Sequence, residues 1–190
     1  MSEKTEQPKF ETDRGSWGPG PWQDEPDRVE FEAHGLDCLM IRGPVGAWCG
    51  YVAVPRGHRA YGKGYDSVWV SVHGGLTYAD KCQGHVCHVP KKGRPGDVWW
   101  LGFDCAHYND ISPGVDAAVF QITGKRRRGF PGAAYRTAEW VRREVSGLAR
   151  QLVGTHQNTH QAPTKMGGNG RNGQNGRKAK TAVHRRKSGS

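Results

Sequence analysis

The segment from Asp97 to Cys105, with the sequence DVWWLGFDC, is nearly continuous in apolar and aromatic residues. Such a run, at the length of one strand, is typical of a β-strand that is covered on both faces. Because a single strand cannot cover itself, the chain is expected to build a sheet around this segment and to pack other elements on it. Side chains alternate across a strand, which predicts two groups: Val98, Trp100, Gly102 and Asp104 on one face, and Trp99, Leu101, Phe103 and Cys105 on the other.

Several other segments predict strands. Residues 28–33 and 36–42 flank a turn-like His-Gly pair and predict a hairpin, and residues 47–55 predict a third strand that ends at Pro55. In residues 67–73, SVWVSVH, valines alternate with other residues, which is the pattern of a half-buried strand. The GGLTYA that follows predicts a turn leading into another short extended piece.

One helix is predicted near the end of the folded part. Thr137 can cap it, Gly154 ends it, and its apolar residues recur at steps of three and four: Val141, Val145, Leu148, Ala149 and Leu152. The sequence therefore predicts an α+β fold, a small and mainly antiparallel β-sheet with a C-terminal α-helix packed on it.

This folded part is expected to be a single domain over residues 27–154. Residues 1–26 are polar and rich in Pro and Gly and predict a flexible leader, in which Trp17 and Trp22 could fold back onto the domain. Residues 155–190 are rich in Gly, Asn, Lys and Arg, without periodic apolar positions, and predict a disordered basic tail.

The net charge of +10 belongs mainly to this tail. From Ala162 to the end there are eight Lys or Arg and no acidic residue, so residues 1–161 carry 20 basic against 18 acidic side chains. This balance argues against a folded nucleic-acid-binding module. A basic run and the tail still predict non-specific contact with phosphates, through Arg126, Arg127, Arg128, Lys178, Arg185 and Arg186. In the alternative interpretation, the basic run is a solvated loop that binds no phosphate.

The expected location is the cytoplasm, without a membrane partner. No stretch approaches the roughly 18–20 apolar residues that span a bilayer, and the N-terminal residues lack the apolar core of a signal peptide. In that compartment cysteines are expected as thiols or metal ligands rather than disulfides, which applies to Cys38, Cys49, Cys82, Cys87 and Cys105.

The strongest candidate site follows the central strand. Asp104 lies where the apolar strand ends, and Cys105, His107 and Asp110 come directly after it. A carboxylate at the tip of a buried strand is costly unless it is paired, hydrogen-bonded or bound to a metal. Loops at strand ends are also common places for functional side chains. In the alternative interpretation, Asp104 caps the following turn and Cys105 is a small core residue.

A second group of residues is expected to join this site. His73 closes the strand predicted over residues 67–73, and Gly74 and Gly75 follow it. Two glycines permit positive φ and let a ligand or another part of the chain approach closely. If the two strands are neighbours, His73 lies beside Asp104 and His107. By itself, the segment is also compatible with an ordinary β-turn.

Two further cysteine-containing segments are weaker candidates. CQGHVCH offers Cys82, His85, Cys87 and His88 as zinc ligands. The pair spacing is poor for a structural zinc site, and the second pair would have to be Cys105 and His107; otherwise the segment is a polar loop. Cys49 lies within a predicted strand with no local base and is interpreted as a core residue.

Three motifs in order, WCGYVAVPRGH, VHGGLTYA and WWLGFDCAH, resemble a family of small proteins of tailed bacteriophages, especially those of actinobacteria. The resemblance covers about residues 45–153 and includes a Tyr before the closing helix, here Tyr135; Arg59 stands where the family often has Pro. It implies a single small domain made in the cytosol of an infected bacterium, without assigning an activity or cofactor. Its motifs match His58, His73, Asp104, Cys105 and His107.

The leading hypothesis is a small hydrolase that acts on a nucleotide-like or other polar small molecule. In its metal version His73, Asp104 and His107 bind a divalent ion, Zn²⁺ or Mn²⁺, and Asp110 lies behind them or acts as base. In its thiol version Cys105 is the nucleophile, with His107 or His73 as base. The metal version is preferred because two His and one Asp form a common open set of ligands.

Two other functions remain open. The first is a non-catalytic protein that sequesters a ligand or binds a host protein through aromatic residues. The second is a nucleic-acid-associated protein that uses the basic tail. Under the ligand-binding hypotheses the contact residues are predicted to be His58, Trp48, Tyr51, Gly74, Gly75 and Tyr78. The sequence makes no prediction of the oligomeric state.

Overall fold

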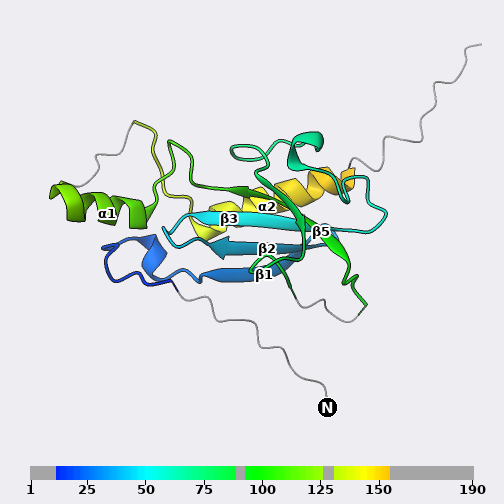
Figure 1. Ribbon diagram of the computed structural model, residues 1–190, viewed down its shortest axis with the longest axis horizontal. Helices are drawn as coiled ribbons and strands as arrows, with labels where there is room; N and C mark the ends of the chain where they lie inside the picture. The colour runs from blue at the N-terminus through cyan, green and yellow to red at the C-terminus, as the bar shows by residue number, and fades with distance from the viewer. Residues whose placement is uncertain (1–11, 89–92, 126–130, 155–190) are drawn as a thin grey trace, which may run out of the picture. The chain divides into compact units, whose positions relative to one another are not determined.

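The computed structural model describes residues 12–88, 93–125 and 131–154. Its centre is a five-stranded antiparallel sheet in the order β1-β2-β3-β5-β4 (Figure 1). The strands are β1 (Arg28–Ala33), β2 (Leu36–Arg42), β3 (Trp48–Pro55), β4 (Tyr78–Lys81) and β5 (Val98–Asp104). The predicted apolar strand, β5, therefore lies inside the sheet, between β3 and β4.

The predicted hairpin is confirmed. β1 and β2 pair from Ala33 opposite Leu36 to Arg28 opposite Ile41. His34 and Gly35 connect them with φ values of 51° and 80°. Positive φ at both central residues matches the twist of the flanking strands, and Gly adopts it at no steric cost.

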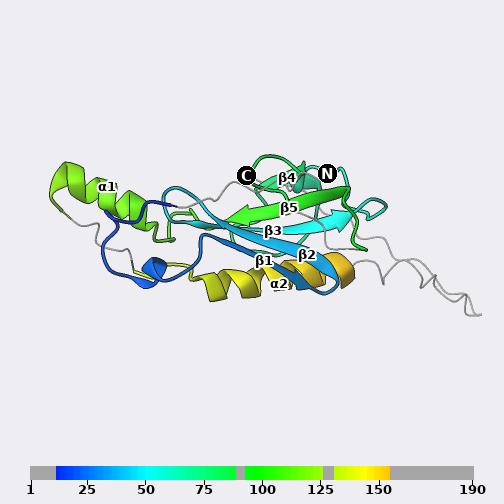
Figure 2. The same ribbon diagram turned by 90° about the horizontal axis from the view of Figure 1, so that it is seen from below.

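A single long helix, α2 (Ala138–Gly154), covers one face of the sheet (Figures 1 and 2). Thr137 caps it, since its Oγ1 accepts a hydrogen bond of 3.2 Å from the backbone N–H of Trp140. Its apolar stripe is fully buried against the sheet: Val141, Val145, Leu148, Ala149 and Leu152. The predicted α+β fold, with a C-terminal helix packed on an antiparallel sheet, is confirmed.

Both faces of β5 are covered, as its sequence predicts. Leu101, Phe103 and Cys105 belong to the core under α2. Val98 and Trp100 belong to a second buried cluster on the opposite face, together with Leu39, Ile41, Tyr51, Ala53 and Val86. The central strand is thus held by two small cores rather than one.

The strand predicted over residues 67–73 is not present, and that prediction is wrong. A 3-10 turn, η2 (Tyr65–Ser67), is followed by extended chain without a partner strand. Val68, Val70 and Val72 do pack on the core, so the alternation reflects real packing. The backbone of Ser71 instead exchanges two 2.7 Å hydrogen bonds with the side-chain amide of Gln151 on α2. The edge beside β5 is occupied by β4, the short extended piece expected after GGLTYA.

Residues 12–26 are not a flexible leader, in contrast to the prediction. They include a short 3-10 turn, η1 (Pro21–Gln23), and Trp17, which is only 6% exposed. Arg42, fully buried, binds Glu25 at 2.7 Å and Asp27 at 2.9 Å. A buried guanidinium requires such partners, and the N-terminal segment supplies them. Residues 1–11 and the predicted tail lie outside the described residues.

A second helix, α1 (Pro113–Thr123), was not predicted. Its start and stop signals are present, with Pro113 at the first turn and Gly124 in the left-handed conformation (φ 66°) at its end. Its sequence lacks a periodic apolar face, and Pro113 is its only buried residue. In the part of the chain that the structure describes, no helix combines the length and apolar character needed to span a membrane.

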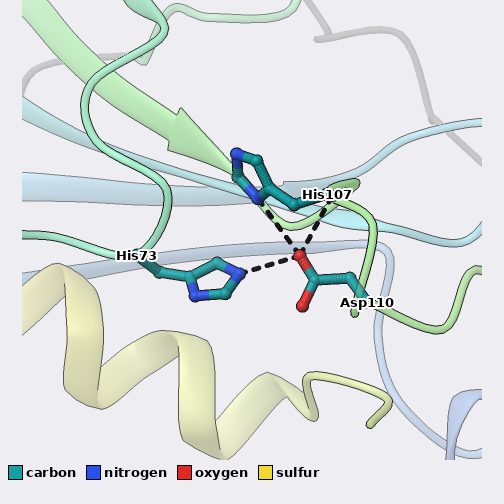
Figure 3. A group of neighbouring side chains, drawn as sticks. All are labelled: His73, His107 and Asp110. Atoms are coloured by element: carbon teal, nitrogen blue, oxygen red, sulfur yellow. Dashed lines mark hydrogen bonds and ion pairs between the residues drawn. The ribbon is translucent and has the colours of Figure 1, made fainter. Parts of the chain in front are cut away.

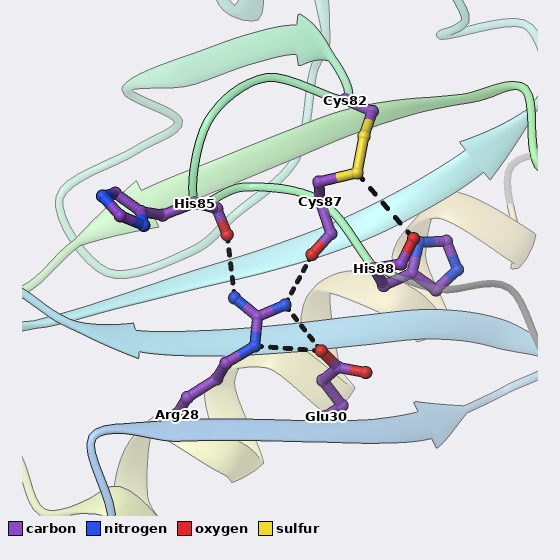
Figure 4. The surroundings of a disulfide bond; sticks show 6 residues. All are labelled: Arg28, Glu30, Cys82, His85, Cys87 and His88. Carbon is purple, nitrogen blue, oxygen red and sulfur yellow. Dashed lines mark hydrogen bonds and ion pairs between the residues drawn. A yellow bond between two sulfur atoms is a disulfide. The ribbon is translucent and has the colours of Figure 1, made fainter. Parts of the chain in front are cut away.

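The cysteine-rich segment 82–88 forms a disulfide loop, which corrects the predictions of free thiols and of zinc ligands there. Gln83 and Val86 pair across its turn, and Cys82 is bonded to Cys87 (Figure 4). Arg28 on β1 donates to the carbonyls of His85 (2.8 Å) and Cys87 (2.5 Å). Sulfur atoms in a disulfide do not bind a metal ion, so Cys82 and Cys87 are not zinc ligands. The segment packs on the second core through Val86.

Candidate functional site

Three side chains from two turns, one after residue 72 and one over residues 107–110, converge at one end of the sheet: His73, His107 and Asp110 (Figure 3). His73 Nε2 lies 2.8 Å from Asp110 Oδ2, and His107 Nδ1 lies 3.1 Å from the same oxygen. The two imidazole rings are 5.0 Å apart between centroids and nearly perpendicular. The predicted meeting of His73 with the segment after β5 therefore occurs.

His73 is positioned by α2 rather than by a neighbouring strand. Its backbone N–H donates to Glu144 Oε2 at 3.2 Å, and its ring meets the Trp140 ring edge to face at 5.2 Å. With Gln151 holding Ser71, the extended segment runs along α2 until the turn after His73 directs the chain away. Contacts with α2 therefore position His73, whereas the sequence pattern predicted that a neighbouring strand would do so.

Gly74 makes room for the second imidazole. Its φ is +66°, and a Cβ built there would lie 2.0 Å from Cε1 of His107. A side chain there would displace the His107 ring, so both the backbone conformation and the position of that ring favour glycine. Gly75 also has a positive φ, +85°, but a Cβ there would meet nothing within 4 Å.

Asp110 is the most buried member of the site, with its side chain 1% exposed. Its Oδ1 accepts from Arg136 Nε at 2.8 Å, and its Oδ2 also accepts from the backbone N–H of His107 at 3.1 Å. Burial by itself would raise the pKa of Asp110, but hydrogen bonds from His73, Arg136 and the His107 N–H outweigh it and lower that pKa. Asp110 is therefore an ionised acceptor; an imidazole nitrogen that faces its Oδ2 donates to it while it carries hydrogen, and can bind a metal ion only in the tautomer that leaves this nitrogen without hydrogen.

Asp104, predicted as a metal ligand, takes a different place. Its Oδ1 accepts from the N–H of Ala106 at 3.0 Å, so it caps the turn after β5 as in the alternative interpretation. The same oxygen lies 4.0 Å from His107 Nε2. His107 is thus placed between two carboxylates, with Nδ1 toward Asp110 and Nε2 toward Asp104. Asp110, rather than Asp104, therefore lies with His73 and His107.

The trio is compatible with a divalent metal ion. Metal–ligand bonds of about 2.0–2.2 Å place neighbouring ligand atoms roughly 3 Å apart. The two nitrogen-to-Oδ2 distances meet this requirement, and the three ligand atoms all lie within 4.8 Å of one another. The hydrogen bond from Arg136 to Asp110 Oδ1 corresponds to the outer hydrogen bonds that orient metal ligands, while Asp104 lies 4.0 Å from His107 Nε2.

Cys105, predicted as a possible nucleophile, lies in the core under α2 and is 2% exposed. Burial and the nearby carboxylate of Asp110 strongly raise the pKa of its thiol. A cysteine nucleophile needs the opposite, a lowered pKa and access to solvent. The thiol version of the hydrolase is therefore not supported. Burial also raises the pKa of Cys49, the cysteine interpreted as a core residue.

Most of the predicted ligand-contact residues have structural roles. The ring of His58 is 3.1 Å from both the Leu152 carbonyl and the Ala60 N–H, and Trp48 is fully buried against Arg42. Tyr51 and Tyr78 pack edge to face in the second core. Only Gly74 and Gly75 adjoin the site. The basic residues 126–128 and those of the tail lie outside the described residues.

Sequence reasoning missed three residues from the region of α2: Arg136, Trp140 and Glu144. They are spaced four apart, which puts Trp140 and Glu144 on one side of the helix. The Arg136 guanidinium lies 4.7 Å from the Trp140 ring centroid while it holds Asp110. A charged and aromatic stripe beside the apolar stripe was the available signal.

Comparisons with protein-family models, with curated proteins and with solved structures found no match to this chain.

Proposed function

We propose that the protein is a small metal-dependent hydrolase that acts on a nucleotide-like or other polar small molecule. The observation that carries the proposal is the convergence of two imidazole nitrogens on one oxygen of a buried carboxylate, at 2.8 and 3.1 Å. Two His and one carboxylate leave coordination positions open for water and substrate. The proposal includes the expectation, from the resemblance to phage proteins, that this protein acts in the cytoplasm of an infected bacterium.

Each residue of the site has a defined task in the proposal. His73, His107 and Asp110 hold the ion, Zn²⁺ or Mn²⁺, which supplies Lewis acidity and lowers the pKa of water. Arg136 keeps Asp110 ionised and fixes its orientation through the 2.8 Å hydrogen bond to Oδ1. Asp104, partly exposed with its Oδ1 4.0 Å from His107 Nε2, is a carboxylate beside that ring that can accept a proton.

Metal binding is the first test. Calorimetric titration of the chelator-treated full chain with Zn²⁺ or Mn²⁺ should show one site per chain. His73→Ala, His107→Ala and Asp110→Asn should each weaken binding by well over tenfold. His34→Asn is the matched control, since His34 lies on the β1–β2 turn and Asn tolerates its positive φ. Equal affinity in the wild type and all three site variants would refute the metal site.

Activity is the second test. Hydrolysis of nucleotides and of bis(p-nitrophenyl) phosphate should be abolished by EDTA and restored by the metal, and Asp110→Asn should lose it. Activity that survives both EDTA and Asp110→Asn would contradict the proposed mechanism. Metal binding in which every substrate is recovered unchanged would contradict the hydrolase and favour the ligand-sequestering alternative.

A further inference from the structure

A groove away from the His73–His107–Asp110 site combines an exposed aromatic ring with two cations. It has a volume of about 290 Å³ and is lined by Arg59, Ala60, Lys63, Ser67, Val68 and Trp69. This volume is close to the lower end of the roughly 300–1,000 Å³ that small-ligand pockets occupy. Its two cations come from the turn after β3, and Trp69 comes from the extended segment after η2.

Trp69 is the feature that needs an explanation. It is 90% exposed, while its neighbours Val68 and Val70 pack on the core. Tryptophan is highly buried on average, because its large apolar surface is unfavourable in water. Here the alternation of the extended segment directs Trp69 outward, next to the groove. An exposed indole beside positive charges is the arrangement on which nucleobases stack.

The walls of the groove are fixed before any ligand binds. Ala60 is 2% exposed and its N–H donates to His58 Nδ1 at 3.1 Å. The carbonyl of Lys63 accepts from Trp99 Nε1 at 3.0 Å, which ties the cationic turn to β5. On the other side the N–H of Ser67 donates to Gly64 O at 3.0 Å. Binding therefore requires little ordering of the backbone, which favours affinity.

The charges of the groove suit an anionic ligand. Arg59 and Lys63 are both exposed and line it. The nearest acidic residue in sequence, Asp66, accepts a 3.3 Å hydrogen bond from Ser67 Oγ. Cations at the rim can meet a phosphate, while the indole face meets a base. A second groove of about 300 Å³, lined by α2 and by His34, contains Arg142, Arg143 and Arg150 but no Trp, Tyr or Phe.

We propose that the groove of Trp69, Arg59 and Lys63 binds a nucleotide unit, with the base stacked on Trp69 and the phosphate on the two cations. The unit can be a free nucleotide or part of a single-stranded nucleic acid. This site is independent of the proposed hydrolase, since none of its residues belongs to the metal trio.

The test is fluorescence anisotropy of the full chain with a short fluorescein-labelled oligothymidylate, together with tryptophan quenching by thymidine monophosphate. Trp69→Ala should weaken binding about 5- to 150-fold, the range expected for the loss of one base–aromatic stack. Trp69→Phe should keep most of the affinity. Ile122→Ala, which removes another exposed apolar side chain (84%), should leave it unchanged.

A charge-matched pair of variants locates the phosphate contact. Arg59→Gln/Lys63→Gln should weaken binding and reduce its salt dependence, whereas Arg143→Gln/Arg150→Gln in the α2 groove should have little effect. All variants keep the same basic tail, so differences among them report on the folded part. The nucleotide site is supported if both probes, or either one, bind with an affinity that depends on Trp69. Which probe binds shows whether the ligand is a free nucleotide or part of a single-stranded nucleic acid. The inference is overturned if neither probe binds, if Trp69→Ala matches Ile122→Ala, or if the α2 pair causes the larger loss.

Discussion

At the scale of single residues, Asp110 links the site to the rest of the molecule. One of its oxygens faces two imidazoles, and the other is held by Arg136. Its loop is tied to the segment before α2 by hydrogen bonds between Ile111 N and Ala134 O, and between Ala134 N and Asn109 O. Asp110 therefore has both a structural role and a proposed chemical one, and its variants must be read on stability and on metal binding.

Gly74 provides a clean test of the site geometry. Gly74→Ala should displace the His107 ring, because the new Cβ would lie 2.0 Å from it, and should weaken Zn²⁺ binding at least tenfold by calorimetry. Gly75→Ala carries the same cost of a positive φ without that contact. Its metal affinity should stay close to wild type. Equal losses in both variants would assign the effect to backbone strain rather than to His107.

The lowered pKa of Asp110 predicts a pH dependence of stability. A carboxyl whose pKa is lower in the folded than in the unfolded state stabilises the fold above its unfolded pKa, here 3.8. This contribution should disappear as the pH falls from about 4 through the folded pKa. Urea unfolding across this range should show a smaller loss in Asp110→Asn than in wild type. The exposed Asp66→Asn serves as control; if Asp110→Asn follows the wild-type curve, the assignment fails.

At the scale of elements, α2 contacts three parts of the molecule: the sheet, the extended segment before His73, and His73 itself. Its apolar stripe covers the sheet, while Gln151 and Glu144 hold the extended segment and Trp140 contacts His73. The disulfide loop 82–88 covers the other face, where the ring of His88 meets Trp100 at 5.1 Å and its Nε2 lies 3.0 Å from Asp37. The sheet is thus held between a helix and a cross-linked loop.

Reduction of Cys82–Cys87 should destabilise the protein moderately. The chain-entropy estimate for so short a loop is about 2 kcal/mol of unfolding free energy. Urea denaturation with and without dithiothreitol should show the corresponding shift in midpoint. The Cys82→Ser/Cys87→Ser variant should already have the lower midpoint and should not respond to dithiothreitol. A reductant-insensitive wild type would show that the bond contributes nothing to stability.

At the scale of the whole molecule, a buried charge cluster joins the N-terminal segment to the sheet and to α2. Glu25 accepts hydrogen bonds from Arg42 (2.7 Å), Tyr135 (2.6 Å), Trp48 Nε1 (3.2 Å) and the Ala138 N–H (2.7 Å). Burial tends to raise the pKa of Glu25, and these hydrogen bonds, led by that from Tyr135, lower it overall. Sequence positions more than a hundred residues apart are held together at this point.

Loss of Glu25 should therefore destabilise the fold. Glu25→Ala leaves Arg42 buried with fewer partners, which should cost about 3 kcal/mol. Asp24→Ala, at the exposed neighbouring position, should change stability by less than about 0.5 kcal/mol. Equilibrium unfolding in urea measures both. Similar values for the two variants would mean that the N-terminal segment is not anchored through Glu25.

Local patterns in the sequence were sufficient for most of the secondary structure. The hairpin at His34–Gly35, the double-faced β5 and the capped helix at Thr137 each depend on neighbouring residues, and each is confirmed. The helix α1 was missed because its apolar residues have no period, although Pro113 and Gly124 mark its ends. Residues 12–26 were wrongly predicted as flexible, because their contacts involve Arg42, which is distant in sequence.

By itself, the sequence determined the antiparallel α+β fold and the two segments that form the site, because hydrophobic periodicity and turn chemistry are local. Only the tertiary structure decided which aspartate meets the two imidazoles, that Cys105 faces the core, and that Cys82 bonds to Cys87. Those outcomes depend on the direction of side chains after a turn and on partners far along the chain, Arg136 and Gly74 above all. The periodicity of a sequence does not give the distances between side chains that are far apart along the chain, whereas the packing of the folded protein does.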